Sequence, residues 1–209
     1  MTPPLKLKMA LQDLPHKCER TLLVPDDINM RQLHFIIQQA FDWRNAHLFE
    51  FKDVKWKSTI SVGMPDDVEM EWIGPPKQDP HKVKLKETFL NENNAKTFWY
   101  WYDFGDDWWH RISFLKGTLK DLEQFEGSPK CLKAIGKCPP EDVGGPWGYT
   151  DFLDAIRDIK HPEHHEYKEW CGMEEDDLYD ENEVDIEKIN TLLKTFYVSK
   201  KWKAKTYDL

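Results

Sequence analysis

The sequence predicts an α+β fold, in which a mixed, mainly antiparallel sheet carries an early helix across it and is followed by a helical C-terminal region. The first observation is that apolar residues change from alternate spacing to helical spacing and back within residues 5–56. The second is that helical spacing returns after residue 149. The resulting ββαβ start is also compatible with a ubiquitin-like grasp.

Two strands and a helix open the chain. Residues 5–14 alternate apolar and polar side chains, which is typical of a half-buried strand, and residues 18–25 continue as a second strand. In residues 26–43 the spacing becomes helical, and Asn29 with Gln32 three residues later has the form of a capping box. The predicted buried face of this helix consists of Leu33, Ile36, Ile37, Ala40 and Phe41.

The middle of the chain predicts more strands. Residues 46–56 alternate again and predict a strand, whereas residues 62–81, rich in proline, glycine and acids, predict a loop with at most one short strand. Residues 84–91 predict a helical turn. A β-hairpin follows at residues 97–115, with Gly105 in its turn and aromatic side chains on both faces. Aromatic residues on both faces indicate that other segments cover the hairpin from both sides.

The C-terminal half is predicted to be mainly helical. Residues 117–148 contain several glycines and prolines and predict irregular structure. Residues 149–159 and 161–172 predict two helices. Residues 174–185 hold eight acidic side chains and no basic one, which predicts an acidic loop, and residues 186–196 predict a closing helix.

These elements predict a single domain over residues 1–209. We divide it into a sheet-rich part at about 1–116, a loop and helical part at about 117–198, and a basic tail at 199–209. The chain has 209 residues, of which 40% are hydrophobic. A chain of this length and composition can bury one substantial core.

The charge distribution excludes some partners. The net charge is -9, and residues 119–190 carry 8 Lys/Arg against 20 Asp/Glu, a net of -12. Because such a body repels phosphate backbones, nucleic-acid binding is not expected. The sequence shows no apolar run suited to a membrane helix and no signal peptide, so we expect a cytoplasmic protein. Its cysteines would then be reduced thiols: Cys18, Cys131, Cys138 and Cys171.

Four segments follow one another in a specific order: LHFIIQQAFDWRNAHLFEF, YDFGDDWWH, CPPEDVGGPWGYTDFLDAI and HPEHHEYKEW. Together they resemble the plasmid pRiA4b ORF-3-like family, over roughly residues 5–190. The resemblance implies a protein family that is found on plasmids, in mobile elements and in chromosomes, and that has no assigned biochemical activity. Some of its members are passenger proteins of mobile elements and carry a resolvase label. That label does not fit this chain, because its five arginines are dispersed through an acidic protein.

The loop PPEDVGGPWGY is the most unusual segment and predicts a ligand pocket where it faces the hairpin turn. Prolines stiffen its entry, and its paired glycines permit positive φ or a close approach of another backbone. The alternative is a structural loop whose acids cap backbone amides. The candidate ligand-binding residues are Asp103, Asp106, Trp108, His110, Glu141, Asp142, Gly144, Gly145, Trp147 and Tyr149.

A metal site is the sharper alternative. Carboxylates of the hairpin turn and the histidine after it can converge, and this donor set suits zinc, manganese or iron. Against this, no metal is needed if the aspartate caps the turn and the histidine forms a hydrogen bond with that aspartate across the strands. We therefore predict no cofactor and keep a divalent metal as the alternative. Its candidate ligands are Asp103, Asp106, His110 and His161.

Two functions remain open. The first is a non-enzymatic binding module, in which an aromatic, acidic groove recognises a protein or a small-molecule ligand. The second is a metal-assisted hydrolase built on Asp103, Asp106 and His110. No catalytic residue is assigned, because the sequence supplies no obvious nucleophile. An enzyme needs these carboxylates and the imidazole at one open point, whereas a module leaves them apart as caps and cross-strand pairs.

Overall fold

The computed structural model describes residues 2–64 and 75–203. Its centre is a seven-stranded sheet in the order β4-β3-β5-β6-β1-β2-β7, in which all neighbouring strands are antiparallel. The strands are β1 (Leu5–Leu11), β2 (Cys18–Val24), β3 (Phe49–Lys52), β4 (Ser61–Gly63), β5 (Thr97–Tyr102), β6 (Trp108–Leu115) and β7 (Lys130–Ile135). The helices are α1 (Met30–Phe41), α2 (Leu119–Gln124), α3 (Gly145–Arg157), α4 (His164–Trp170), α5 (Ile186–Val198) and α6 (Lys200–Lys203), with a π-helix at Lys86–Glu92.

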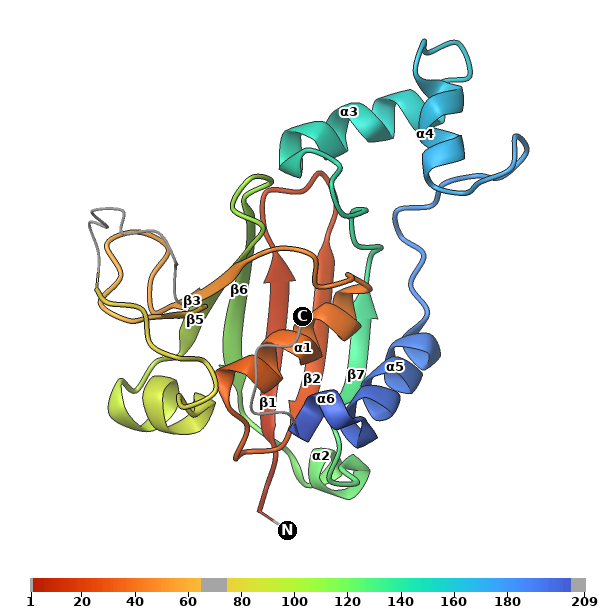
Figure 1. The fold of residues 1–209 in the computed structure, drawn as a ribbon. Helices are drawn as coiled ribbons and strands as arrows, with labels where there is room; N and C mark the ends of the chain where they lie inside the picture. The colour runs from red at the N-terminus through yellow and green to blue at the C-terminus, as the bar shows by residue number, and fades with distance from the viewer. Residues whose placement is uncertain (1, 65–74, 204–209) are drawn as a thin grey trace.

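The predicted α+β class is confirmed, with a mainly antiparallel sheet, an early helix across it and a helical C-terminal region. The ββαβ order that suggested a ubiquitin-like grasp is present in β1, β2, α1 and β3, as part of this larger sheet. Strand β6 lies at its centre, where it pairs with β5 on one side and with β1 on the other. The hairpin of β5 and β6 is therefore joined directly to the hairpin of β1 and β2 (Figure 1).

Helix α1 lies across one face of the sheet (Figure 1). Its predicted capping box is confirmed, because the Gln32 amide donates to Asn29 Oδ1 over 2.8 Å and the Asn29 amide donates to Gln32 Oε1 over 3.0 Å. The helix ends at Asp42, whose left-handed backbone has a φ of 62°. The five side chains predicted for its apolar face are all buried: Leu33, Ile36, Ile37, Ala40 and Phe41.

The aromatic hairpin contributes large side chains to the core, alongside those of the other strands. Alternate residues Phe98, Tyr100 and Tyr102 of β5 are fully buried, as the period of two predicts. In β6, His110 lies opposite Tyr100, so this histidine also points into the core. The buried apolar residues form one cluster that extends from β1 to α5.

The C-terminal helices lie in two places. Helices α5 and α6 lie beside β7 on the face that carries α1, while α3 and α4 lie beyond the ends of the strands (Figure 1). The His164 ring of α4 contacts the Ala155 carbonyl oxygen of α3 through Nδ1, over 3.0 Å. Within the described ranges, no helix combines the length and apolar character that crossing a membrane requires.

The structure corrects the prediction of irregular structure for residues 117–148. This segment contains α2 and also β7, which pairs with β2 at one edge of the sheet. Thr118 forms a capping box with Asp121 at the start of α2. The strand is short and carries lysines at both Lys130 and Lys133, so its apolar alternation is weak.

Several predicted boundaries also move. Helix α3 begins at Gly145, four residues before the predicted start, and Ile159 lies past its end, largely exposed. Helix α4 begins at His164 because residues 161–163 form a turn. Of the predicted strand 46–56, only Phe49–Lys52 forms a strand, which is β3.

The predicted loop 62–81 begins within β4, and its residues 65–74 lie outside the described part of the chain. The predicted basic tail, 199–209, begins with the short helix α6, whose Trp202 ring packs edge-on against Phe196 at 5.9 Å. Residues 204–209 of this tail lie outside the described part.

Two buried histidines predict a loss of stability in weak acid. Burial lowers the pKa of His34 and of His110 to about 3, against about 6.5 in an unfolded chain. Because the unfolded chain binds protons that the folded chain excludes, stability present above pH 6.5 is lost as the pH falls toward 3. We expect the free energy of unfolding to fall by about 2 kcal/mol per histidine between pH 7 and pH 5, measured by urea unfolding.

A His110→Met variant should lose about half of this pH dependence, because methionine fills the buried position without titrating. Equal slopes in the native protein and His110→Met would show that His110 is not held neutral by burial.

Candidate functional site

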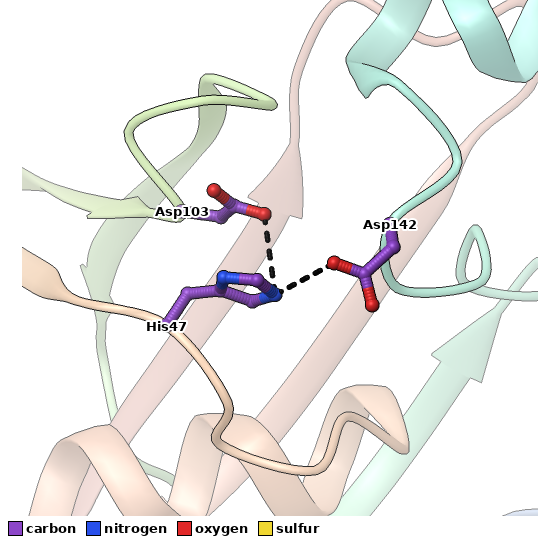
Figure 2. A group of neighbouring side chains, drawn as sticks. All are labelled: His47, Asp103 and Asp142. Atoms are coloured by element: carbon purple, nitrogen blue, oxygen red, sulfur yellow. Dashed lines mark ion pairs between the residues drawn. The ribbon is translucent and has the colours of Figure 1, made fainter.

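Three loops meet beyond one end of β5 and β6 (Figure 2). We name them the α1–β3 loop (residues 43–48), the hairpin turn (residues 103–107) and the α3 entry loop (residues 138–144). Each contributes one side chain to a single cluster, and these are His47, Asp103 and Asp142. The imidazole of His47 lies between the two carboxylates.

The position of His47 is fixed by backbone hydrogen bonds on either side of it. The Ala46 amide donates to the hydroxyl of Tyr102 over 3.0 Å, and the Asp103 amide donates to the Leu48 carbonyl over 3.0 Å. The imidazole also meets the Tyr102 ring edge-on, with 5.8 Å between the ring centroids. The Nε2 edge of His47 is therefore held toward the other two loops.

Asp103 divides its two carboxylate oxygens between the hairpin turn and the histidine. Its backbone is left-handed, with a φ of 52°, which aspartate adopts more readily than most residues. Oδ1 accepts a hydrogen bond from the Gly105 amide over 3.1 Å, and the Asp107 amide closes the turn on the Asp103 carbonyl over 2.7 Å. Oδ2 remains free of the turn and lies 3.5 Å from His47 Nε2.

Asp142 is placed by its buried neighbour Glu141. Glu141 Oε1 accepts a hydrogen bond from the Tyr102 hydroxyl over 2.6 Å, and Oε2 accepts one from the Arg44 amide over 2.8 Å. With Glu141 anchored inward, Asp142 takes a left-handed backbone, with a φ of 64°, at the surface. Its Oδ1 lies 2.9 Å from His47 Nε2.

Asp106 fastens the α3 entry loop to the hairpin turn. The Gly144 amide donates to Asp106 Oδ2 over 3.1 Å. Gly145 follows with a φ of 68°, and a Cβ atom added there would stand 2.3 Å from the Asp106 carbonyl oxygen. The glycine at 145 therefore allows the two backbones to touch, as the sequence predicts for this pair of glycines.

The three clustered side chains are spaced as ligands of one metal ion. His47 Nε2, an Asp103 oxygen and an Asp142 oxygen all lie within 4.8 Å of one another. Ligands bound about 2.0–2.2 Å from a cation lie roughly 3–3.5 Å apart, which fits the two contacts of Nε2. This nitrogen is shielded from solvent and directs no hydrogen bond at either oxygen. No other three His, Cys, Asp or Glu side chains meet in this way within residues 2–64 and 75–203.

The cluster opens to solvent on the side of Asp142. The side chain of Asp142 is 58% exposed, against 28% for His47 and 12% for Asp103. A hollow of about 430 Å³ adjoins it between the α3 entry loop and α4. Its lining consists of Asp142, Val143, Glu166, Tyr167, Glu169 and Trp170. A larger cleft of about 710 Å³ contains none of the three clustered side chains.

Six of the ten predicted ligand-binding residues lie in these loops or at the contact between two of them. The α3 entry loop meets the hairpin turn through the contacts of Asp106, so the predicted approach of these two segments is present in the structure. The six residues are Asp103, Asp106, Glu141, Asp142, Gly144 and Gly145.

The predicted convergence of Asp103, Asp106 and His110 is not formed. Trp108 and His110 lie on the buried face of β6, where the His110 ring meets Trp43 edge-on at 5.3 Å. Because strand residues alternate between faces, His110 points into the core, away from the end of the hairpin. The histidine that joins the turn is supplied by another loop.

The remaining candidates lie away from the cluster. Trp147 is 86% exposed on α3, while Tyr149 is buried with its hydroxyl 3.3 Å from that of Tyr179. His161 precedes α4, and its Nδ1 accepts a hydrogen bond from the Glu163 amide over 3.3 Å. None of these side chains is part of the group around His47.

Sequence reasoning does not identify His47. This residue lies near the start of the predicted strand 46–56, where the alternation places it on the same side as Phe49 and Phe51 and marks it as a strand residue. The signal that could have found it is its place inside LHFIIQQAFDWRNAHLFEF, the first of the four segments that carry the family resemblance.

Comparison with known proteins gives the relationship of the whole chain. The family model described as plasmid pRiA4b ORF-3-like protein matches residues 4–188. The chain belongs to the plasmid pRiA4b ORF-3-like family. It is 38% identical over 185 residues to the uncharacterized protein y4hQ of Sinorhizobium fredii (strain NBRC 101917 / NGR234). The aligned residues cover 88% of each chain.

A solved structure has the same fold. The crystal structure of MM3350, a protein of unknown function from Methanosarcina mazei Go1, is 28% identical to this chain, with a TM-score of 0.70. The similarity covers 88% of this chain and 96% of that one. In this pRiA4b ORF-3-like protein, the first three segments that carry the resemblance contribute the three loops of the cluster, and the fourth contributes α4 beside the hollow.

The close contact at Gly145 predicts that a larger residue there destabilises the protein. Gly145→Ala should lower the free energy of unfolding by about 2–3 kcal/mol, because the new Cβ meets the Asp106 carbonyl and alanine disfavours positive φ. Urea unfolding measures the change. The control is Gly117→Ala, where a Cβ meets no atom within 4 Å and a change below about 0.5 kcal/mol is expected. If both variants lose the same stability, the close approach at Gly145 does not hold the loop.

Proposed function

We propose that this protein binds a divalent transition-metal ion through His47, Asp103 and Asp142, and that the ion ties together the three loops beside a hollow in which a ligand binds. The observation that carries the proposal is the spacing of the three ligand atoms around His47 Nε2. One imidazole with two carboxylates suits zinc, manganese or iron. The proposal keeps the predicted aspartate Asp103 and replaces the predicted His110 by His47.

The chemistry of the hollow favours a ligand that carries positive charge. Glu166 and Glu169 supply carboxylates in addition to Asp142, and Tyr167 and Trp170 supply aromatic rings. A cation is attracted both by carboxylates and by the faces of aromatic rings. A basic segment of another protein, or a small cationic molecule, fits this aromatic, acidic groove. This proposal is therefore a form of the predicted binding module.

Metal-assisted hydrolysis is the second candidate function. Three protein ligands leave coordination positions for a water molecule, and the exposed side of Asp142 is where such a water would enter. A divalent ion held by these three side chains would lower the pKa of its bound water and so would supply a nucleophile. Release of nitrophenol from carboxylic and phosphate esters, absent from an Asp142→Asn variant, would favour this function over the binding module.

We expect the protein to bind about one equivalent of zinc or manganese per chain. The first measurement is elemental analysis of protein purified without chelators and without a metal-affinity tag. Titration calorimetry of metal-free protein then gives Kd for each ion. Asp142→Asn should raise Kd at least about tenfold, because it removes a charged ligand at an exposed position that the fold does not need.

The matched control is His165→Gln. His165 lies 2.8 Å from the carboxylate of Glu175 at an exposed position, but no third possible ligand among the described residues joins this pair. This variant should bind the metal as the native protein does. If Asp142→Asn binds with unchanged affinity, the ion lies elsewhere and the proposal fails.

A further inference from the structure

The larger cleft, of about 710 Å³, holds chemistry that the metal site does not use. It lies between the C-terminal end of α1, the segment after β7, α4 and α5. Arg20 and Cys138 both line it. Cys138 is partly exposed, whereas Cys18, at the start of β2, is fully buried behind it.

Cys18 and Arg20 both lie against the Gly136 carbonyl, which accepts a hydrogen bond from Arg20 Nη1 over 3.0 Å. The Cys18 sulfur lies 3.9 Å from the Gly136 carbonyl oxygen, two residues before Cys138. Glu19 of β2 pairs with Ile135 of β7, so the register of the sheet brings Cys18 beside Gly136, the residue two positions before Cys138.

Arg20 provides a buried positive charge beside the thiols. Its Nε donates to the Ala40 carbonyl over 2.8 Å, and its Nη1 donates to the carbonyls of Ile135 and Gly136, each over 3.0 Å. No carboxylate in the described ranges forms an ion pair with it. A buried cation without a carboxylate favours negative charge on a neighbouring sulfur.

The two thiols therefore differ in how readily they lose a proton. The hydrogen bond from Cys138 and the charge of Arg20 lower the pKa of Cys18 from its ordinary value, while burial and the neighbouring sulfur raise the pKa of Cys138. By contrast, burial alone raises the pKa of Cys131 to about 11.

We propose that Cys18 and Cys138 form a thiol–disulfide exchange site, which a small disulfide entering the cleft converts to an internal disulfide. The Cys138 thiolate, its proton passed to Cys18 or solvent, attacks one sulfur of the small disulfide, which releases one small thiolate. The small thiolate takes up the proton, and the Cys18 thiolate then attacks the Cys138 sulfur of the mixed disulfide and releases the second small thiolate. The two protons of the cysteines end on the two small thiols, so two cysteines are oxidised and one small disulfide is reduced.

The test is exposure of the native full chain to oxidised glutathione, followed by intact mass and peptide mapping. We expect the loss of two hydrogen atoms and a peptide that links Cys18 to Cys138, both reversed by dithiothreitol. Cys18→Ser, or Cys18→Ala if the serine variant is unfolded by circular dichroism, should stop at a glutathione adduct on Cys138, because the resolving thiol is absent. Cys138→Ser should leave Cys18 unmodified.

The matched control is Cys131→Ser, which removes another buried thiol that contacts the Lys133 carbonyl and no sulfur. It should form the internal disulfide as the native protein does. The proposal is overturned if the native protein stops at an adduct, if the link joins Cys138 to Cys171 across the cleft, or if all thiols remain free. None of these readouts depends on metal binding, so the two proposals succeed or fail separately.

Discussion

The carboxylate of Glu141 is the contact on which the candidate site depends. It lies buried and accepts hydrogen bonds from the Tyr102 hydroxyl and the Arg44 amide, so it ties the α3 entry loop to β5 and to the α1–β3 loop. A buried carboxylate is costly unless its oxygens are satisfied, and here both of them are. The loops that carry His47 and Asp142 thus share one anchor, although they are far apart in the chain.

A second network fixes the same region from the side of α1. Tyr100 contacts the imidazole of His34 through its hydroxyl over 2.8 Å and accepts a hydrogen bond from Gln38 over 3.0 Å. The other end of the Gln38 side chain accepts from the Asn45 amide over 2.9 Å. The α1–β3 loop is therefore held by a helix, a strand and a loop at once. A cluster supported in this way needs little rearrangement to hold the proposed ion.

The sequence pattern predicted the parts of the fold whose side chains repeat clearly, such as α1 with its capping box at Asn29 and the hairpin with its alternating aromatics. It did not predict β7, because lysines at Lys130 and Lys133 obscure the apolar alternation of a short edge strand. In the site, the approach of the α3 entry loop to the hairpin turn followed from its glycines and acids. The histidine of the cluster could not be predicted in the same way, because only the folded chain brings His47 beside the turn and buries His110 in the core.

The pairing of β1 with β6 has a consequence for synthesis. Strand β1 gains its second neighbour only after residue 115 is made, since Lys6 pairs with Leu115. At about 5–20 residues per second, the first hairpin waits several seconds on the ribosome with its β1 edge unpaired. An open edge is a template for strands of other chains, and lysines along it discourage such pairing. Lys6 and Lys8 stand on this edge, so the nascent strand carries its own protection against aggregation until β6 arrives.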